Sequence, residues 1–199
     1  MNPSIRLATE SDAEDVAAIY APIVERTHVS FETDPPSVGT IRRRIRDTLT
    51  HLPWLVCEYD GRVLGYAYAS PYSDRDAYQW TVIVSVYVDD QWRRCGVGRG
   101  LYESLFTGLQ LQGLCNAIAV IALPNEPSVT FHESFGFERI GVYRRIGFKD
   151  GTWWDVGHWQ RQLQKADGRP SSPVPLAKLQ NEDRMKAALS TGVASIRLP

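Results

Sequence analysis

Three features typical of membrane, secreted or nucleic-acid-binding proteins are missing from this sequence. No apolar run approaches the ~20 residues that a membrane-spanning helix needs. The first residues, Met1 to Ser4, do not begin a basic and then apolar signal pattern. The 22 basic and 23 acidic residues leave a formal net charge of −1, which gives no electrostatic reason to expect nucleic acid or an anionic membrane. We therefore expect a cytoplasmic protein that binds neither nucleic acid nor membrane.

Cysteine and histidine are also scarce. The cysteines are odd in number and form no CxxC pair, which argues against a disulfide framework. The histidines, His28, His51, His132 and His158, show no metal-ligand spacing, so the sequence predicts no metal site. What is present is ordinary for a globular protein: 199 residues, 43% of them hydrophobic, enough for one domain and a short appendage.

Apolar periodicity divides most of the chain into strands and helices. Strands are predicted at 5–8, 54–59, 63–69, 80–88, 117–121, 138–143 and 153–160. Helices are predicted after Thr9, after Ser37, which can cap its helix, over 98–112, where Gly113 ends the helix, and over 125–135. Asp60-Gly61 predicts a hairpin turn, because a type I′ turn needs positive φ at both central positions. The 80–88 strand is apolar on both alternations and should lie at the centre of the sheet. The fold class is therefore α/β (α+β).

The most informative stretch is Arg93-Arg94-Cys95-Gly96-Val97-Gly98-Arg99-Gly100, named here the glycine loop. It follows a buried strand and precedes a helix. Glycine lets the backbone turn tightly and come close to a ligand, and the amides of a helix N-terminus favour an anion. Three arginines add positive charge. Such a loop is suited to a pyrophosphate.

Two other phosphate-binding loops fit this spacing less well. A dinucleotide loop needs G-x-G-x-x-G and an acidic residue about 20 positions later, whereas the third glycine here comes one residue early and the 115–120 region has no acidic residue. A Walker loop needs Gly-Lys-Ser/Thr, and no lysine lies here. The pattern R-x-x-G-x-G between a strand and a helix resembles the pyrophosphate loop of the GNAT superfamily of N-acetyltransferases.

Four further blocks make the resemblance more specific. They are AYQWTV at 77–82, VYV at 86–88, IALPNEPSV at 121–129 and GTWWDVGHWQR at 151–161. In order and spacing they resemble the phosphinothricin acetyltransferase-like family over about residues 4–162. The resemblance implies a GNAT fold, with a central mixed, mostly antiparallel sheet, splayed central strands and flanking helices. It also implies an acetyl-CoA-dependent N-acetyltransferase acting on the primary amine of a small amino-acid-like acceptor, of phosphinothricin or methionine sulfoximine type, and a possible homodimer.

The resemblance also implies roles for particular residues. The cofactor-binding set is Val86, Tyr87, Val88, Arg93, Arg94, Cys95, Gly96, Val97, Gly98, Arg99, Asn125 and Ser128. Phe31, Arg75 and Tyr78 lie in segments that line the acceptor pocket in this family, and His132 occupies a place near the coenzyme sulfur, which makes it the candidate catalytic residue.

Structural roles remain open for four of these residues. Asn125 could only cap a helix, His132 could be a hydrogen-bonded half-buried histidine, Phe31 could only pack, and Arg75 could be a solvated loop charge.

One position departs from the family. The central strand of the relatives reads Trp-Thr-Val-Glu, and that glutamate is a favoured candidate for the base, but this chain has Ile83 there. The amine must then lose its proton to His132, whose ordinary pKa suits the task, or to water. A non-catalytic acetyl-CoA-binding protein is the alternative function.

The composition shifts near residue 165. We expect a GNAT domain over 1–164 and a Pro/Ser-rich linker and tail over 165–199, with a helical turn or two within 181–189. The Pro, Ser and Gly content predicts that the tail is dispensable for the fold, unless it docks through Met185, Leu189 or Ile196.

Overall fold

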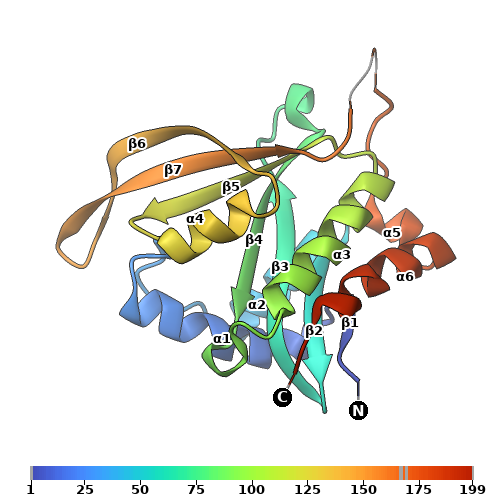
Figure 1. The fold of residues 1–199 in the computed structure, drawn as a ribbon, viewed down its shortest axis with the longest axis horizontal. Coiled ribbons are helices and arrows are strands. Elements are labelled where there is room, and N and C mark those ends of the chain that lie inside the picture. The colour runs from blue at the N-terminus through green and yellow to red at the C-terminus, as the bar shows by residue number, and fades with distance from the viewer. Residues whose placement is uncertain (1, 166–167, 169, 199) are drawn as a thin grey trace.

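The computed structural model describes residues 2–165, 168 and 170–198. Figure 1 shows one curved sheet with helices on both faces. The strands are β1 (Ser4–Leu7), β2 (Trp54–Tyr59), β3 (Arg62–Pro71), β4 (Thr81–Val88), β5 (Asn116–Leu123), β6 (Glu138–Lys149) and β7 (Thr152–Gln162). The α-helices are α1 (Ala13–Arg26), α2 (Val38–Leu49), α3 (Val97–Leu111), α4 (Glu126–Glu133), α5 (Leu176–Leu179) and α6 (Asp183–Ser190). Short 3-10 turns are η1 (Glu10–Asp12), η2 (Asp76–Tyr78), η3 (Asp90–Trp92) and η4 (Thr191–Ser195).

The sheet splits at its centre. Its strand order is β1-β2-β3-β4-β5-β7-β6, and β4 with β5 is its parallel pair. These two strands pair from Thr81↔Asn116 to Ile83↔Ile118 and then separate, as Figure 1 shows. The predicted mixed, mostly antiparallel sheet with splayed central strands is confirmed. The split leaves the second half of β4 without a neighbour on one edge.

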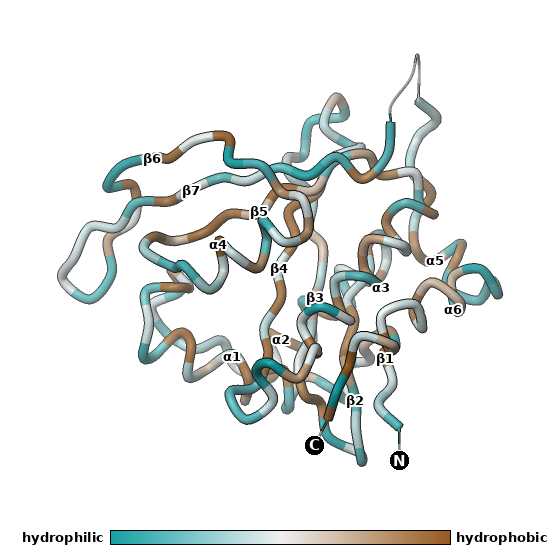
Figure 2. Tube along the Cα trace, in the orientation of Figure 1, coloured by the Kyte–Doolittle hydropathy of each residue, from teal (hydrophilic) through white to brown (hydrophobic). Residues whose placement is uncertain are grey.

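The helices cover the two faces of the sheet. Helices α1 and α2 pack on β2, β3 and β4 around one buried cluster, which includes Val16, Ile41 and Tyr66. Helix α3 packs on the other face, over a larger cluster that includes Leu101 and Leu105. Figure 2 shows long hydrophobic stretches on the central strands and hydrophilic residues at most of the turns. The 80–88 strand is apolar because it lies at the centre of the sheet, as predicted, and Val82 and Val84 on it are buried.

Several local signals in the sequence act as predicted. Asp60 and Gly61 both have positive φ, 51° and 73°, as the hairpin turn requires. The Ser37 hydroxyl accepts the backbone N–H of Thr40 at 3.2 Å and caps α2. Gly113, at φ 87°, lies just beyond the end of α3. These features depend on neighbouring residues only, which is why sequence patterns reveal them.

The second hairpin differs from the prediction. Strand β6 runs to Lys149 rather than ending near Tyr143, because a register shift between Tyr143 and Gly147 lets pairing with β7 resume. Trp159 is buried, but Trp153 is 49% exposed.

The segment after β7 folds back onto the domain. Part of the predicted linker, residues 166, 167 and 169, lies outside the described residues. Beyond it, α5, α6 and η4 pack beside α3 and β1, and Figure 1 shows the red C-terminal end running beside the start of α3. Met185 and Ile196 are buried and Leu189 packs against the core, so the tail docks through the three residues named for this possibility. The described residues contain no helix long and apolar enough to cross a bilayer.

Candidate active site

A cleft of about 590 Å³ opens where β4 and β5 separate. The end of β4, the glycine loop, the C-terminal end of α1 and the exposed side of α4 form its walls. It contains every predicted cofactor residue except Cys95. Six further lining residues were not predicted: Ile23, Thr27, Val29, Trp92, Pro127 and Phe131. The first three belong to α1 and the loop after it, and no local motif distinguishes them.

The free edge of β4 turns backbone polar groups toward this cleft. The Trp80 carbonyl bonds to backbone N–H groups at the start of β5, whereas the Asp89 N–H donates to β3. Successive residues of a strand direct their N–H and C=O groups to alternate sides. Val84, Val86 and Val88 therefore present theirs to the gap, where β5 is no longer paired. These groups can hydrogen-bond an extended ligand that lies along the strand.

The glycine loop supplies backbone donors. Gly96 is the N-cap of α3 with φ 79°, and as a glycine it has no side chain to occupy the amides of the first turn. Arg94 also has a positive φ, 64°, which is uncommon for a residue with a side chain. The successive turns leave free N–H groups at the positive end of the α3 dipole, on the cleft wall. This is the geometry of an anion site.

The three arginines of the loop differ in their partners. Arg93 pairs with Asp90 at 2.6 Å on the surface, and Arg99 lies 3.6 Å from Glu103 and over the Phe135 ring. Arg94 has no ion pair within the part of the chain that the structure describes. Exposed pairs contribute little to stability, so all three charges remain available to an anionic ligand.

Asn125 has the structural role that the sequence left open. Its Oδ1 accepts the backbone N–H of Ser128 at 3.3 Å and caps α4. Both residues also line the cleft, so capping does not remove the Asn125 amide from the site.

His132 lines the cleft and is 6% exposed. Its Nδ1–H donates to the Ser128 carbonyl at 2.8 Å, and its Nε2 accepts the hydroxyl of the fully buried Tyr102 at 3.0 Å. Because a carbonyl can only accept, the proton is placed on Nδ1. Desolvation lowers the pKa of His132, and the bond to Ser128 only partly opposes this. The ring is neutral, with both nitrogens engaged.

No carboxylate lines the cleft among the described residues. Ile83, where the family resemblance implies a glutamate, is half-buried on β4 at the last residue pair before the split. No nearby acid replaces that glutamate in the cleft. The described residues also contain no group of three potential metal ligands.

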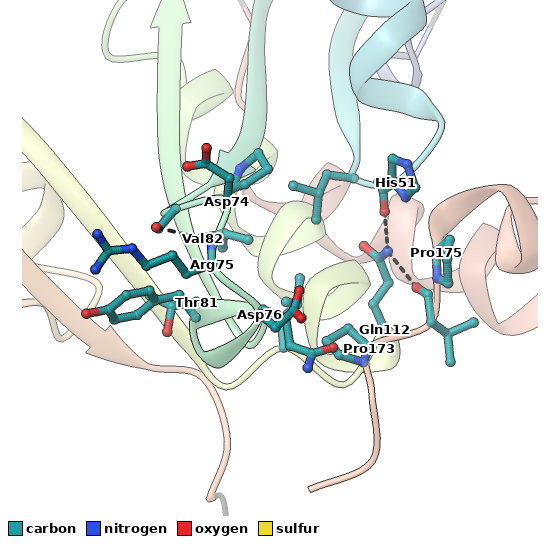
Figure 3. A pocket seen from close by; sticks show the side chains of 16 residues that line it. His51, Asp74, Arg75, Asp76, Thr81, Val82, Gln112, Pro173 and Pro175 are labelled. Atoms are coloured by element: carbon teal, nitrogen blue, oxygen red, sulfur yellow. Dashed lines mark hydrogen bonds between the residues drawn. The ribbon is translucent and has the colours of Figure 1, made fainter.

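The predicted acceptor residues are not brought into this cleft. Phe31 is 39% exposed and its ring lies against Gly147 of β6, where even a Cβ atom would overlap it. Arg75 and Tyr78 line a second cavity of about 310 Å³ at the other end of β4, which Figure 3 shows. The Thr81 end of the strand faces this second cavity, and the Val88 end faces the cleft. An acceptor role for these three residues stays a prediction.

A buried lysine, which sequence patterns did not reveal, holds one wall of the cleft. Lys149 is 4% exposed, and its ammonium donates to the carbonyls of Val24, Thr27 and Ser30 at 2.6, 2.9 and 2.8 Å. It ties the β6–β7 hairpin to the end of α1 and to the loop that carries Val29. Its neighbours in sequence form an ordinary turn, so only the tertiary fold shows the role.

Comparisons with known proteins agree with this geometry. Residues 5–158 match the acetyltransferase (GNAT) domain family. A phosphinothricin N-acetyltransferase of Streptomyces viridochromogenes is 41% identical over 171 residues, which covers 85% of this chain and 93% of that protein. An L-methionine sulfoximine/L-methionine sulfone acetyltransferase of Pseudomonas aeruginosa is 32% identical, covering 85% of this chain and 100% of that protein.

The same similarity is seen in solved structures. A GNAT superfamily phosphinothricin acetyltransferase from Sinorhizobium meliloti, solved in complex with acetyl-CoA, superposes with a TM-score of 0.82 at 31% identity, over 87% of this chain and 96% of that one. Since the family match extends over more than half of the chain and includes every residue that lines the cleft, this protein belongs to the GNAT acetyltransferase family.

Proposed function

We propose that this protein transfers the acetyl group of acetyl-CoA to the primary amine of a small amino-acid-like acceptor, of phosphinothricin or methionine sulfoximine type. One observation carries the proposal: the glycine loop and the free edge of β4 meet in a single cleft at the split of the sheet. Relatives with these activities are similar over most of the chain.

The cleft fits the donor in two parts. The first-turn amides of α3 and the arginines of the glycine loop suit the pyrophosphate. The backbone groups of Val86 and the carbonyl of Val88 suit the amide-containing pantetheine arm, which would lie along the strand edge. The thioester would then reach the split of the sheet, close to His132.

The split also offers what the reaction needs. Attack on the thioester places negative charge on its carbonyl oxygen, and a fixed backbone N–H can stabilise that charge. The unpaired N–H of Val88 is the candidate donor. Holding donor and amine in one cleft supplies a further part of the rate enhancement.

We propose that the amine loses its proton to water rather than to His132. With its bond to Tyr102, its burial and its lowered pKa, the ring is a weak proton acceptor. The α-amino group of a peptide has a pKa near 8, and the neighbouring carboxylate of a free amino acid raises that pKa, so the neutral fraction and the turnover should grow as the pH rises above neutral. His132→Ala should then lower turnover by less than about tenfold, whereas a general base would contribute roughly 10²–10⁴. A Tyr102→Phe variant removes the partner of Nε2 without removing the ring and serves as the matched control.

A thiol-release assay tests the proposed activity. Acetyl-CoA is incubated with phosphinothricin, L-methionine sulfoximine, L-methionine sulfone and the common amino acids, and free coenzyme A is measured. We expect release with at least one of the first three and formation of the N-acetyl product. Coenzyme A binding without acetylation of any amine would refute the proposal and favour the non-catalytic function to which Ile83 points.

We also propose that two copies associate through the β6–β7 hairpin. Five large apolar side chains are exposed on it: Ile140, Tyr143, Ile146, Phe148 and Trp153. Light scattering should give twice the 22.4 kDa chain mass, and Ile146→Asp should give the single mass. A wild-type protein of single mass would refute the association.

The balanced charge supports two further proposals, a cytoplasmic location and partners that are neither nucleic acid nor membrane. Cell fractionation and gel-shift and vesicle-flotation assays test them. Recovery in the membrane fraction, or a shift with DNA or RNA, would refute them.

A further inference from the structure

The C-terminal segment outside the family match is part of the folded domain. The matched region ends at residue 158, and α5, α6 and η4 follow it. The segment is anchored where it begins: the Gln112 amide donates to the carbonyls of His51 and Val174 at 2.7 and 2.8 Å, as Figure 3 shows. From there it runs along α3 toward the glycine loop.

The first turn of α3 is shaped to receive this segment. A Cβ atom on Gly100 would overlap the backbone of Gly192, and one on Gly96 would overlap the carbonyl of Ser195. A Cβ on Gly98, in contrast, would make ordinary 3.5 Å contacts with Phe131 and Val88 in the cleft. The three glycines of the loop therefore serve two purposes: Gly98 faces the cleft, while Gly96 and Gly100 make room for the tail.

The tail holds one peptide group of the loop directly. The backbone N–H of Arg197 donates to the carbonyl of Cys95 at 2.8 Å. That carbonyl shares a planar peptide unit with the N–H of Gly96, and in a trans peptide the two groups point in opposite directions. Cys95 does not line the cleft, but Gly96 does. A bond that fixes the carbonyl on the tail side thus directs the Gly96 N–H away from the tail.

A second contact acts on a side chain of the cleft. The Ser195 hydroxyl donates to the Glu103 carboxylate at 2.6 Å, and the other oxygen of Glu103 lies 3.6 Å from the Arg99 guanidinium. The tail therefore contacts the partner of a cleft arginine as well as the backbone of the loop.

We propose that the C-terminal segment positions the glycine loop for pyrophosphate, with the Arg197 backbone N–H holding the Cys95–Gly96 peptide in its anion-binding orientation. This inference rests on the proposed binding of acetyl-CoA at the loop. The tail touches no ligand; it acts through the loop and lowers the cost of ordering the loop when coenzyme binds.

The test removes the N–H and keeps the chain. Arg197→Pro deletes the donor, and the preceding residue, Ile196, already has the extended backbone that a following proline requires (φ −83°, ψ 131°). Arg197→Ala is the matched control: it keeps the N–H and removes the guanidinium, whose hydrogen bonds within the described part of the chain go to the carbonyls of Ala194 and Ile196. Calorimetric titration with coenzyme A and with pantetheine, which lacks the pyrophosphate, is carried out on both variants and on the wild type.

We expect Arg197→Pro to weaken coenzyme A binding by about fivefold to tenfold, the worth of one well-placed hydrogen bond. Arg197→Ala should stay within about twofold of the wild type. The affinity for pantetheine should not change in either variant. A destabilised fold would weaken the binding of pantetheine as well as that of coenzyme A, so this result separates the two causes. Gly192→Ala changes only the tail, but its Cβ would overlap the carbonyl of Gly100 at the end of the loop and push the tail away, so it should also weaken coenzyme A binding selectively.

The outcomes separate the inference from the proposed function. If the wild type does not bind coenzyme A, the proposed function fails. If the wild type binds and folded Arg197→Pro binds equally well, the inference is overturned. Equal losses for coenzyme A and pantetheine, or equal losses in the proline and alanine variants, would overturn it too. If Arg197→Pro does not fold, Gly192→Ala decides in the same way.

Discussion

Replacing the buried lysine of the hairpin should cost this protein much of its stability. Lys149→Met keeps the length and apolar stem of the side chain but removes the ammonium. Three carbonyls then lose their donor, those of Val24, Thr27 and Ser30. Two of these lie at or just beyond the C-terminal end of α1, where carbonyls have no intrahelical partner, and water does not reach a group that is 4% exposed.

The size of the effect follows from these contacts. A buried acceptor left unsatisfied costs about 1–3 kcal/mol, and the variant creates two of them, at Val24 and Ser30, beside the partly buried carbonyl of Thr27. The ammonium no longer has to be desolvated, which offsets part of that cost. We expect a net loss of about 3–5 kcal/mol, the range for removing one partner of a buried charged interaction. For a protein of this length each kcal/mol corresponds to roughly 2–4 °C in Tm, so Tm should fall by roughly 10 °C.

Differential scanning fluorimetry at neutral pH measures this shift. Lys178→Met is the matched control, because Lys178 is exposed and its ammonium makes no hydrogen bond among the described residues. The control should melt within about 1 °C of the wild type. If Lys149→Met also melts within 2–3 °C of the wild type, roughly the effect of one kcal/mol, the three carbonyls are satisfied in another way and the reasoning is wrong.

Four other predictions follow from the cleft and the tail. Gly98→Val, whose two methyl groups would project toward the cleft, should weaken coenzyme A binding about tenfold or more in calorimetric titration, and wild-type affinity would show that the loop is not the anion site. Burial lowers the pKa of His132 in the folded state, so below about pH 6.5 the unfolded chain binds more protons than the folded one. Tm should therefore fall as the pH is lowered through that value, and it should fall less in His132→Gln. An equal dependence of Tm on pH in the two proteins would contradict this. Ile83→Glu should raise kcat by roughly 10² if a carboxylate at this place is the missing base, and an unchanged rate would show that deprotonation does not limit turnover. Truncation after Gln164 removes four nearly fully buried apolar side chains and should lower the free energy of unfolding by at least about 3 kcal/mol. The composition of the tail predicts instead that it is dispensable for the fold, and an unchanged melting curve would support that prediction.

The sequence by itself determined the elements and the class of the site. Strand patterns, the Asp60-Gly61 turn, the Ser37 cap and the order of strand, glycine loop and helix each depend on residues close together in the chain. Physical rules for such short ranges are strong, so they located β4 and α3 to within a residue or two and predicted an anion site between them. The resemblance in four blocks then pointed to the family that the comparisons show.

Tertiary structure alone decided how particular residues in and around that site are used. An isolated histidine side chain has a pKa that suits a general base. In the folded protein, however, packing brings Tyr102 and Ser128 to His132, and they engage both ring nitrogens. Nothing in the sequence around Lys149 distinguishes it from a surface lysine, yet three carbonyls from the end of α1 and the loop after it surround its ammonium. These partners come from 4 to 125 positions away along the chain.

The tail shows the same limit most clearly. Its Pro, Ser and Gly content predicts little burial, and composition counts residues without their neighbours. Leu176, Met185 and Ile196 are nevertheless buried, because α3 presents an apolar face and two glycines where the tail backbone can approach. Local propensity fixes which segments can form helices and strands, whereas burial and hydrogen bonding depend on surfaces that exist only after the chain has folded.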